Sequence, residues 1–144
     1  MGSHFMRYQL DIGADPVTVR RALTTESGVN GWWTDRAEVP ESVGESLELS
    51  FPEVPQPFEL ELVESTPERI VWRAGAFPPW WQGTTVQWEL ADNPDGDGTR
   101  VVMTHAGFEP DNPTVGIVTM GWGEMLARLR GFAEQGRAQP YFSH

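Results

Sequence analysis

The chain of 144 residues contains no cysteine, which excludes disulfide bonds, thiolate metal sites and cysteine nucleophiles. Histidine is also scarce, with three copies in all. His4 and His144 lie at the two ends of the chain, so His105 is the one histidine expected in the folded body. A zinc site would have to combine a single imidazole with carboxylates, and we expect neither a metal nor a cofactor.

No segment approaches the roughly 18 consecutive apolar residues of a membrane span, and no signal peptide opens the chain. Together with the lack of cysteine, this predicts a cytoplasmic protein without a membrane span. We interpret Met1 to Phe5 as an expression scar, so that the natural chain begins at Met6. Residues 6–144 then form a single domain, and the 39% hydrophobic content of the whole chain is enough for one sizeable core.

Positive charge is scarce as well. Ten basic residues face 21 acidic ones, which gives a formal net charge of -11 and a pI near 4.5. Nucleic acids and anionic lipids are bound mainly through clustered Lys and Arg, so neither is an expected partner. We interpret the acidity as a contribution to solubility rather than as a cation-binding feature, and expect it to favour neutral or cationic ligands over polyanions.

The common catalytic motifs are missing too. The chain has no G-x-S-x-G elbow, no P-loop, no G-x-G-x-x-G and no H-E-x-x-H. We therefore assign no catalytic residue, and a binding protein is favoured over an enzyme.

The most strongly patterned segment runs from Asn112 to Gln135, where apolar residues recur in steps of three and four, as on one face of an α-helix. Asn112 is predicted to cap this helix, Pro113 to take its first position, and Gly136 to end it in the left-handed conformation. The predicted buried stripe consists of Val115, Val118, Trp122, Met125, Leu126, Leu129, Phe132 and Ala133.

The residues before this helix alternate between apolar and polar, which is typical of strands with one buried face. A first strand at residues 7–12 is followed by two short helices, one at 16–23 capped by Asp15 and one at 25–33 broken at Gly28 and Gly31. Further strands are predicted at residues 36–39, 47–51, 58–62, 69–74, 84–91 and 99–105, with the Asp- and Gly-rich segment 92–98 as a hairpin connection rather than a calcium loop. Short connections make neighbouring strands antiparallel, so the predicted fold class is α+β, with one curved antiparallel sheet of about seven strands around a long C-terminal helix.

Tryptophan is abundant, with seven copies, four of them in the doublets Trp32-Trp33 and Trp80-Trp81. Neighbouring residues of a regular strand point to opposite faces. One member of each doublet is therefore expected outside the core, at an exposed mouth, in a loop packed on the sheet, or in a cavity wall. The other aromatic residues fit either a plain core or the walls of a ligand cavity, and the sequence leaves both open.

His105 is predicted to share a strand face with Val101 and Met103. Whether that face or the one carrying Val102 and Thr104 is the interior one stays open. A lone histidine of this kind is most often a structural residue satisfied by hydrogen bonds. The alternatives are a general base and a polar anchor at one end of an apolar cavity.

Several short motifs follow one another along the chain: Gly31-Trp32-Trp33, Ile70-Val71-Trp72, Trp81-Gln82-Gly83-Thr84, Thr104-His105-Ala106-Gly107-Phe108, Gly121-Trp122, and Gly136 with Pro140. In these motifs and in the order of its elements the chain resembles the SRPBCC superfamily, the helix-grip fold of START domains and the birch pollen allergen. Within the superfamily it most resembles the homologues of the heat-shock ATPase activator. The resemblance implies a helix-grip fold with a deep cavity between sheet and terminal helix for an apolar or amphipathic small molecule. It implies no single activity, because the superfamily includes ligand carriers, aromatic-polyketide cyclases and a domain that stimulates a chaperone ATPase.

We therefore expect a small-molecule binding protein, monomeric or homodimeric, with a role in bacterial stress response or secondary metabolism. One alternative is a cyclase or hydratase that uses His105 and Glu124 as acid and base. The other is a chaperone-related interaction module, marked by an exposed patch at Trp80 and Trp81. The predicted ligand contacts are Trp33, Phe51, Phe58, Trp72, Trp81, Trp88, Met103, His105, Trp122, Met125, Leu126 and Leu129.

Overall fold

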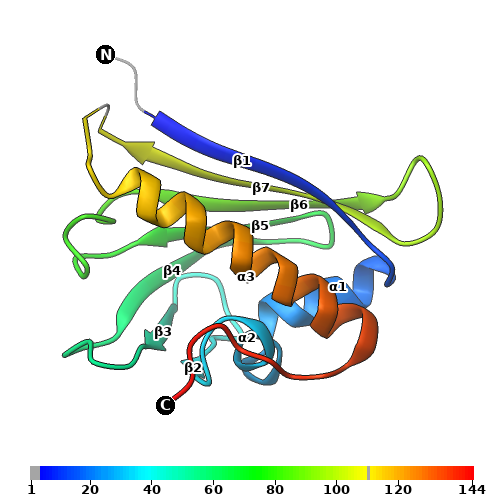
Figure 1. Ribbon diagram of the computed structural model, residues 1–144, viewed down its shortest axis with the longest axis horizontal. Coiled ribbons are helices and arrows are strands. Elements are labelled where there is room, and N and C mark those ends of the chain that lie inside the picture. The colour runs from blue at the N-terminus through cyan, green and yellow to red at the C-terminus, as the bar shows by residue number, and fades with distance from the viewer. Residues whose placement is uncertain (1–3, 110) are drawn as a thin grey trace.

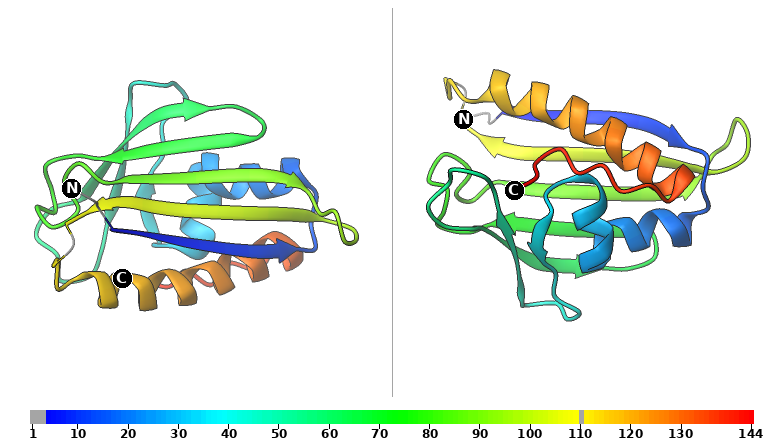
Figure 2. Two further views of the ribbon diagram at one scale, coloured as in Figure 1. Left: turned by 90° about the horizontal axis from the view of Figure 1, so that it is seen from above. Right: turned by 60° about the horizontal axis from the view of Figure 1, so that its bottom comes forward.

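The computed structural model describes residues 4–109 and 111–144. Its seven strands form one antiparallel sheet in the order β1-β7-β6-β5-β4-β3-β2, which curves around the long helix α3 (Figure 1). The helices α1 and α2 lie beside the carboxyl-terminal half of α3 (Figure 2). This confirms the predicted α+β helix-grip fold. The elements are β1 (His4–Ile12), α1 (Pro16–Thr24), α2 (Glu26–Trp32), β2 (Arg36–Glu38), β3 (Ser46–Ser50), β4 (Phe58–Ser65), β5 (Arg69–Ala74), β6 (Thr85–Asp92), β7 (Thr99–Phe108) and α3 (Val115–Gln135).

Helix α3 ends as predicted, because Gly136 takes the left-handed conformation with φ of 69° and donates its N–H to the Phe132 carbonyl. The predicted start is wrong. The cap position falls on Thr114, which makes no side-chain capping hydrogen bond, and the Oδ1 of Asn112 accepts from the backbone N–H and the hydroxyl of Thr114 in the turn before the helix, at 2.9 and 2.6 Å. The helix α3 therefore begins at Val115, directly after this turn. The buried stripe consists of Val118, Trp122, Met125, Leu126 and Leu129, with Val115, Phe132 and Ala133 packed at its edges.

The predicted breaks in the second short helix are also wrong, since α2 runs through Gly28 and Gly31 without interruption. Both glycines lie where the neighbouring chain leaves no room for a side chain. A Cβ atom at Gly31 would collide with the ring of Phe132, and one at Gly28 would collide with the carbonyl oxygen of Arg21. These glycines therefore serve close packing between helices rather than chain reversal.

The strands follow the predicted alternation, with small shifts at their ends. Helix α1 begins after its predicted cap, Asp15, whose carboxylate accepts a hydrogen bond from the Thr18 N–H at 2.8 Å. The segment 92–98 closes the β6–β7 hairpin with a hydrogen bond from Asn93 N to Gly98 O at 3.0 Å. β1 begins at His4, so the last two residues of the predicted scar pair with β7, while Met1 to Ser3 lie outside the described residues. No described helix is long and apolar enough to cross a membrane.

The inner face of β7 carries Val101, Met103 and His105, all fully buried. Val102 and Thr104 point to the outer face and are half-buried. Packing against α3 thus decides the question that the strand pattern left open, because the face that meets the helix is the dry one.

The outer face of the sheet is polar, and glutamates face one another across β2, β3 and β4. Glu38 and Glu48 are paired across β2 and β3, and the pKa of Glu48 is raised, first by a hydrogen bond with Glu38, then by burial and by the neighbouring acidic charges. Glu59 follows on β4, opposite Glu48. Within residues 4–109 and 111–144, no group of three or more ligating side chains is placed to hold a metal ion.

The two tryptophan doublets behave differently. Trp32 and Trp33 are both buried, with ring centroids 5.4 Å apart, because they lie at the end of α2, where successive side chains diverge by about 100° rather than 180°. Both belong to the core, and Trp33 also meets the alternative of a cavity wall, since it lines an apolar groove. In the β5–β6 loop the expectation that one member lies outside the core is confirmed, since Trp80 is 41% exposed and Trp81 is 4% exposed.

Candidate functional site

The space between α3 and the middle of the sheet is filled by tryptophan rings. The centroid of Trp33 lies 5.2 Å from that of Trp122 and 6.0 Å from that of Trp72. Trp88 lies 5.6 Å from Trp72 and 5.9 Å from Trp122. Rings at these separations are in contact. Trp72, Trp88 and Trp122 therefore pack against one another as core at the level where the resemblance implies a cavity.

An apolar groove opens beside this core, between the first half of α3, the β3–β4 loop, the β5–β6 loop and the C-terminal tail. Its volume is about 510 Å³, within the range of roughly 300 to 1,000 Å³ typical of ligand pockets. No charged residue lines it, and its rim carries Ile117 and Met120, which are 74% and 71% exposed. Its aromatic lining consists of Trp33, Phe51, Phe58, Trp80, Trp81, Tyr141 and Phe142.

The C-terminal tail forms one wall of this groove and is fixed by backbone hydrogen bonds. The N–H groups of Tyr141 and Phe142 donate to the carbonyls of Trp32 and Trp33, at 3.0 and 2.9 Å. The Phe142 carbonyl accepts from the N–H of Asp35 at 3.1 Å. The tail thus runs back past α3 to the end of α2 (Figure 2), which places two aromatic side chains at the groove.

Of the predicted ligand contacts, Trp33, Phe51, Phe58, Trp81 and Met125 line this groove. The others are buried in the core beside it: Trp72, Trp88, Met103, His105, Trp122, Leu126 and Leu129. Sequence reasoning missed the rim residues on α3, although Ile117 and Met120 carried a signal. Both are large apolar residues one turn apart, off the buried stripe of an amphipathic helix.

His105 is held by hydrogen bonds at both ring nitrogens. Trp122 Nε1 donates to His105 Nδ1 at 3.0 Å, and His105 Nε2 lies 2.9 Å from Thr84 Oγ1. The Thr84 hydroxyl donates its own hydrogen to the Trp81 carbonyl at 2.7 Å, so Nε2 must be the donor to Thr84. These contacts assign the neutral tautomer with hydrogen on Nε2. Burial lowers the pKa of His105 to about 3, so the ring stays neutral at physiological pH.

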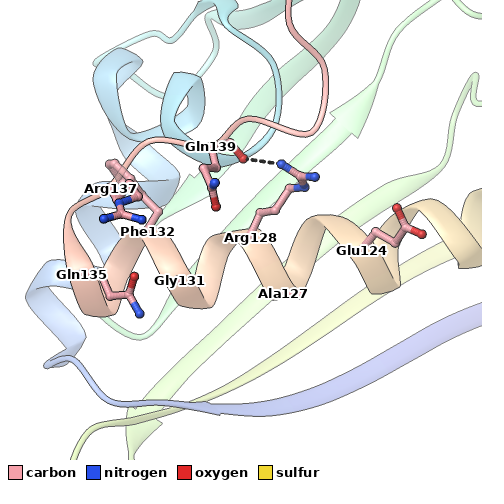
Figure 3. Close-up of a pocket in the computed structure, with 8 residues that line it drawn as sticks. All are labelled: Glu124, Ala127, Arg128, Gly131, Phe132, Gln135, Arg137 and Gln139. Atoms are coloured by element: carbon pink, nitrogen blue, oxygen red, sulfur yellow. Dashed lines mark hydrogen bonds between the residues drawn. The ribbon is translucent and has the colours of Figure 1, made fainter.

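The structure does not bring the candidate acid and base together. His105 is fully buried, whereas Glu124 lies on the exposed side of α3, in a separate polar groove of about 360 Å³ that also carries Arg128 and Arg137 (Figure 3). Glu124 raises the pKa of the Tyr141 hydroxyl, chiefly through a hydrogen bond. Glu124 thus interacts with the tail, and the acid–base interpretation gains no support from this geometry.

Arg128 fastens the same tail to α3. Its Nη1 donates to the Gln139 carbonyl at 2.9 Å, the contact drawn in Figure 3, and to the Pro140 carbonyl at 3.3 Å. Its guanidinium carbon also lies 5.4 Å from the ring centroid of Tyr141. The polar groove therefore lies largely along the contact between α3 and the C-terminal tail.

Thr84→Val is expected to lower the free energy of unfolding by about 1 to 3 kcal/mol, because it leaves the buried His105 Nε2–H without an acceptor. Chemical denaturation followed by circular dichroism measures the change. Thr85→Val, one residue further on the half-buried outer face, is the matched control and should cost less than about 0.5 kcal/mol. Equal effects of the two substitutions would contradict the assigned role of Thr84.

The family model described as activator of Hsp90 ATPase homolog 1-like protein matches residues 14–134. The chain belongs to this family. This confirms the predicted membership in the SRPBCC superfamily, in the branch of homologues of the heat-shock ATPase activator. A comparison with curated proteins found no match.

Solved structures share the fold along most of the chain. The solution structure of the Aha1 dimer from Colwellia psychrerythraea has a TM-score of 0.82 and 23% identity, covering 92% of this chain and 98% of that one. DynU16, a protein in the dynemicin biosynthetic locus, has a TM-score of 0.78 and 22% identity, covering 97% of this chain and 51% of that one. A protein from Mesorhizobium loti has a TM-score of 0.75 and 22% identity, covering 88% of this chain and 94% of that one. At these identities the likeness shows the fold alone.

Proposed function

We propose that this protein binds an apolar or amphipathic small molecule in the groove beside the tryptophan core, as a bacterial cytoplasmic carrier in stress response or secondary metabolism. The observation that carries the proposal is the exposed apolar rim formed by Trp80, Ile117 and Met120 around a groove lined by no charged residue. Large apolar side chains gathered at the surface mark binding sites, since water is displaced from them at a gain of roughly 25 cal/mol per Å². The similarity to a protein from a biosynthetic locus supports the metabolic setting.

The position of the groove refines the mode of binding. The rings at its floor, Trp33 and Trp81, are buried and contact the filled core, so they offer a rigid apolar surface. Rigid aromatic surfaces bind with little loss of side-chain entropy. The ligand would therefore lie in the apolar groove beside the tryptophan core rather than in the space between the sheet and α3.

The same rim supports a second candidate function, an interaction surface between two copies of this chain. Exposed Ile117, Met120 and Trp80 resemble the apolar centre of a protein interface, and the similar structure from Colwellia psychrerythraea is a dimer. Light scattering on the purified protein distinguishes the two. A concentration-independent monomer with a ligand-accessible groove supports the carrier, and a dimer that Ile117→Ser dissociates supports the interface.

The groove is tested with N-phenyl-1-naphthylamine, a neutral apolar fluorophore. Trp80→Ala is expected to weaken its binding by about tenfold, since truncation removes much of an indole from the rim. Val17→Ser, at an apolar position on α1 that is 61% exposed and outside the groove, is the control and should leave the affinity unchanged. Absence of saturable binding, or equal affinity of the wild type and the Trp80→Ala protein, would refute the proposed site.

A further inference from the structure

The geometry points to a specific class of ligand for this groove: an organic cation with a bulky apolar body, such as a quaternary ammonium or phosphonium ion. This inference rests on the proposed function and narrows it. Three observations carry it, namely the arrangement of the aromatic rings, the distribution of charge around the groove, and the backbone conformation of one glutamate at its rim.

The rings of the outer wall meet edge to face. Phe51 contacts Phe58 and Phe142 with centroids 4.6 and 4.9 Å apart, and Tyr141 contacts Phe142 at 4.8 Å, with planes inclined by 65° to 74°. In such a pair, the ring that offers its edge keeps its faces for other partners. A cation is attracted to an aromatic face within about 6 Å of its centroid, and most strongly where water is excluded. A cluster of several such rings is the arrangement that recognises quaternary ammonium groups.

The protein already places one cation on a ring of this wall, since the guanidinium of Arg128 lies over Tyr141. Arg128 is held by the carbonyls of Gln139 and Pro140, and Glu124 lies one turn before it on α3. These two side chains, of opposite charge, line the separate polar groove rather than this one. The groove itself is lined by no basic residue that would repel a bound cation.

The candidate counter-charge for a bound cation is Glu53. It lies exposed in the β3–β4 loop between Pro52 and Val54, which both line the groove. Among the described non-glycine residues it alone has a positive φ, of 65°. This conformation is strained for a residue with a side chain and relaxed for glycine, and strain of this kind gathers at binding sites. We assign the Glu53 carboxylate the role of partner for the bound cation.

The overall charge of the protein acts in the same direction but is not selective. A net charge of -11 attracts any cation and repels any anion, and salt screens this effect. A test of the groove must therefore separate local contacts from the long-range field. Measurement at an ionic strength of roughly 0.5 M, where the Debye length is about 4 Å, meets this need.

The probes are tetraphenylphosphonium and tetraphenylborate, which have nearly the same size and shape and opposite charge. At high salt, quenching of tryptophan emission should show tetraphenylphosphonium binding at least about tenfold more tightly than tetraphenylborate. It should also compete with N-phenyl-1-naphthylamine for the groove. Equal affinities, or tighter binding of tetraphenylborate, would overturn the inference.

Variants at the rim sharpen the test. Glu53→Gln should weaken tetraphenylphosphonium binding by about threefold to tenfold, and by more than it weakens binding of the neutral probe. Glu53→Gly should weaken tetraphenylphosphonium binding as much as Glu53→Gln does. It should also raise the melting temperature, because glycine relieves the backbone strain at this position. Glu41→Gln removes the same charge at an exposed glutamate whose chain neighbours do not line the groove, and it should change neither affinity. If Glu53→Gln and Glu41→Gln weaken tetraphenylphosphonium binding equally, the effect comes from the long-range electrostatic field of the whole protein, and the inference is overturned.

The results also separate this inference from the proposed function. If the neutral probe binds in the groove and the protein shows no preference for tetraphenylphosphonium over tetraphenylborate, the inference of a cationic ligand is refuted and the proposed carrier function is retained. If neither the neutral probe nor the cation binds, both the proposed function and this inference are refuted.

Discussion

Leu129→Asp is expected to lower the free energy of unfolding by more than about 4 kcal/mol, which approaches the whole stability of many domains. Leu129 is fully buried at the carboxyl-terminal end of the α3 stripe, where the substitution would place a carboxylate without a partner and leave a void. Far-UV circular dichroism during urea denaturation measures the loss. If the variant does not accumulate in folded form, Leu129→Ala should show a loss of about 2 to 5 kcal/mol at the same site.

Glu59→Lys is the matched control for this prediction. Glu59 is exposed on the outer face of β4, and its charge contributes to the raised pKa of Glu48. The lysine removes this repulsion, so stability should change by less than about 1 kcal/mol. Losses of the same size in the Leu129→Asp and Glu59→Lys proteins would contradict the assignment of the inner and outer faces.

Acid is expected to destabilise the protein through His105, starting well above the range where carboxylates titrate. The folded state keeps the ring neutral because burial lowers its pKa to about 3, whereas the unfolded chain binds a proton below about pH 6.5. The contribution is therefore fully present above pH 6.5 and is lost as the pH falls towards 3. The linkage predicts a loss of about 1.4 kcal/mol per pH unit across this window, or roughly 2.7 kcal/mol by pH 4.5.

Urea denaturation of the wild type and the His105→Gln protein between about pH 7 and 4.5 tests this prediction. The glutamine variant should be less stable at pH 7, because it disrupts the hydrogen bonds with Trp122 and Thr84, but it should lack the slope due to the imidazole. The two stabilities should therefore converge as the pH falls. Parallel curves would show that the histidine is not held neutral in the fold. The comparison stops at pH 4.5 because Asp11, Asp15 and Asp35, whose pKa values are lowered by their hydrogen bonds, add their own loss of stability in stronger acid.

The candidate site was only partly predictable, for a physical reason. The sequence identified twelve residues as ligand contacts, and five of these line the groove. The centroids of Trp33 and Trp122 are 5.2 Å apart, and whether facing rings of this kind leave a cavity depends on changes in such separations of about an ångström. Periodicity contains no information about such distances. The tail residues Tyr141 and Phe142 were missed because they belong to no periodic element and reach the groove only through hydrogen bonds to Trp32 and Trp33.

The sequence by itself determined the order and type of the elements. It also determined that the terminal helix carries the one long apolar stripe. These features depend on neighbouring residues alone, as at Asp15 before Pro16 and at Gly136 after α3. Only the tertiary structure decided that α2 continues through Gly31 and that His105 faces inward. It also decided that tryptophan rings fill the space between α3 and the sheet, so that the apolar groove lies beside this core. Each of these depends on contacts between residues far apart in the chain, such as Gly31 with Phe132 and His105 with Trp122, and such contacts form only when sheet, helix and tail pack together.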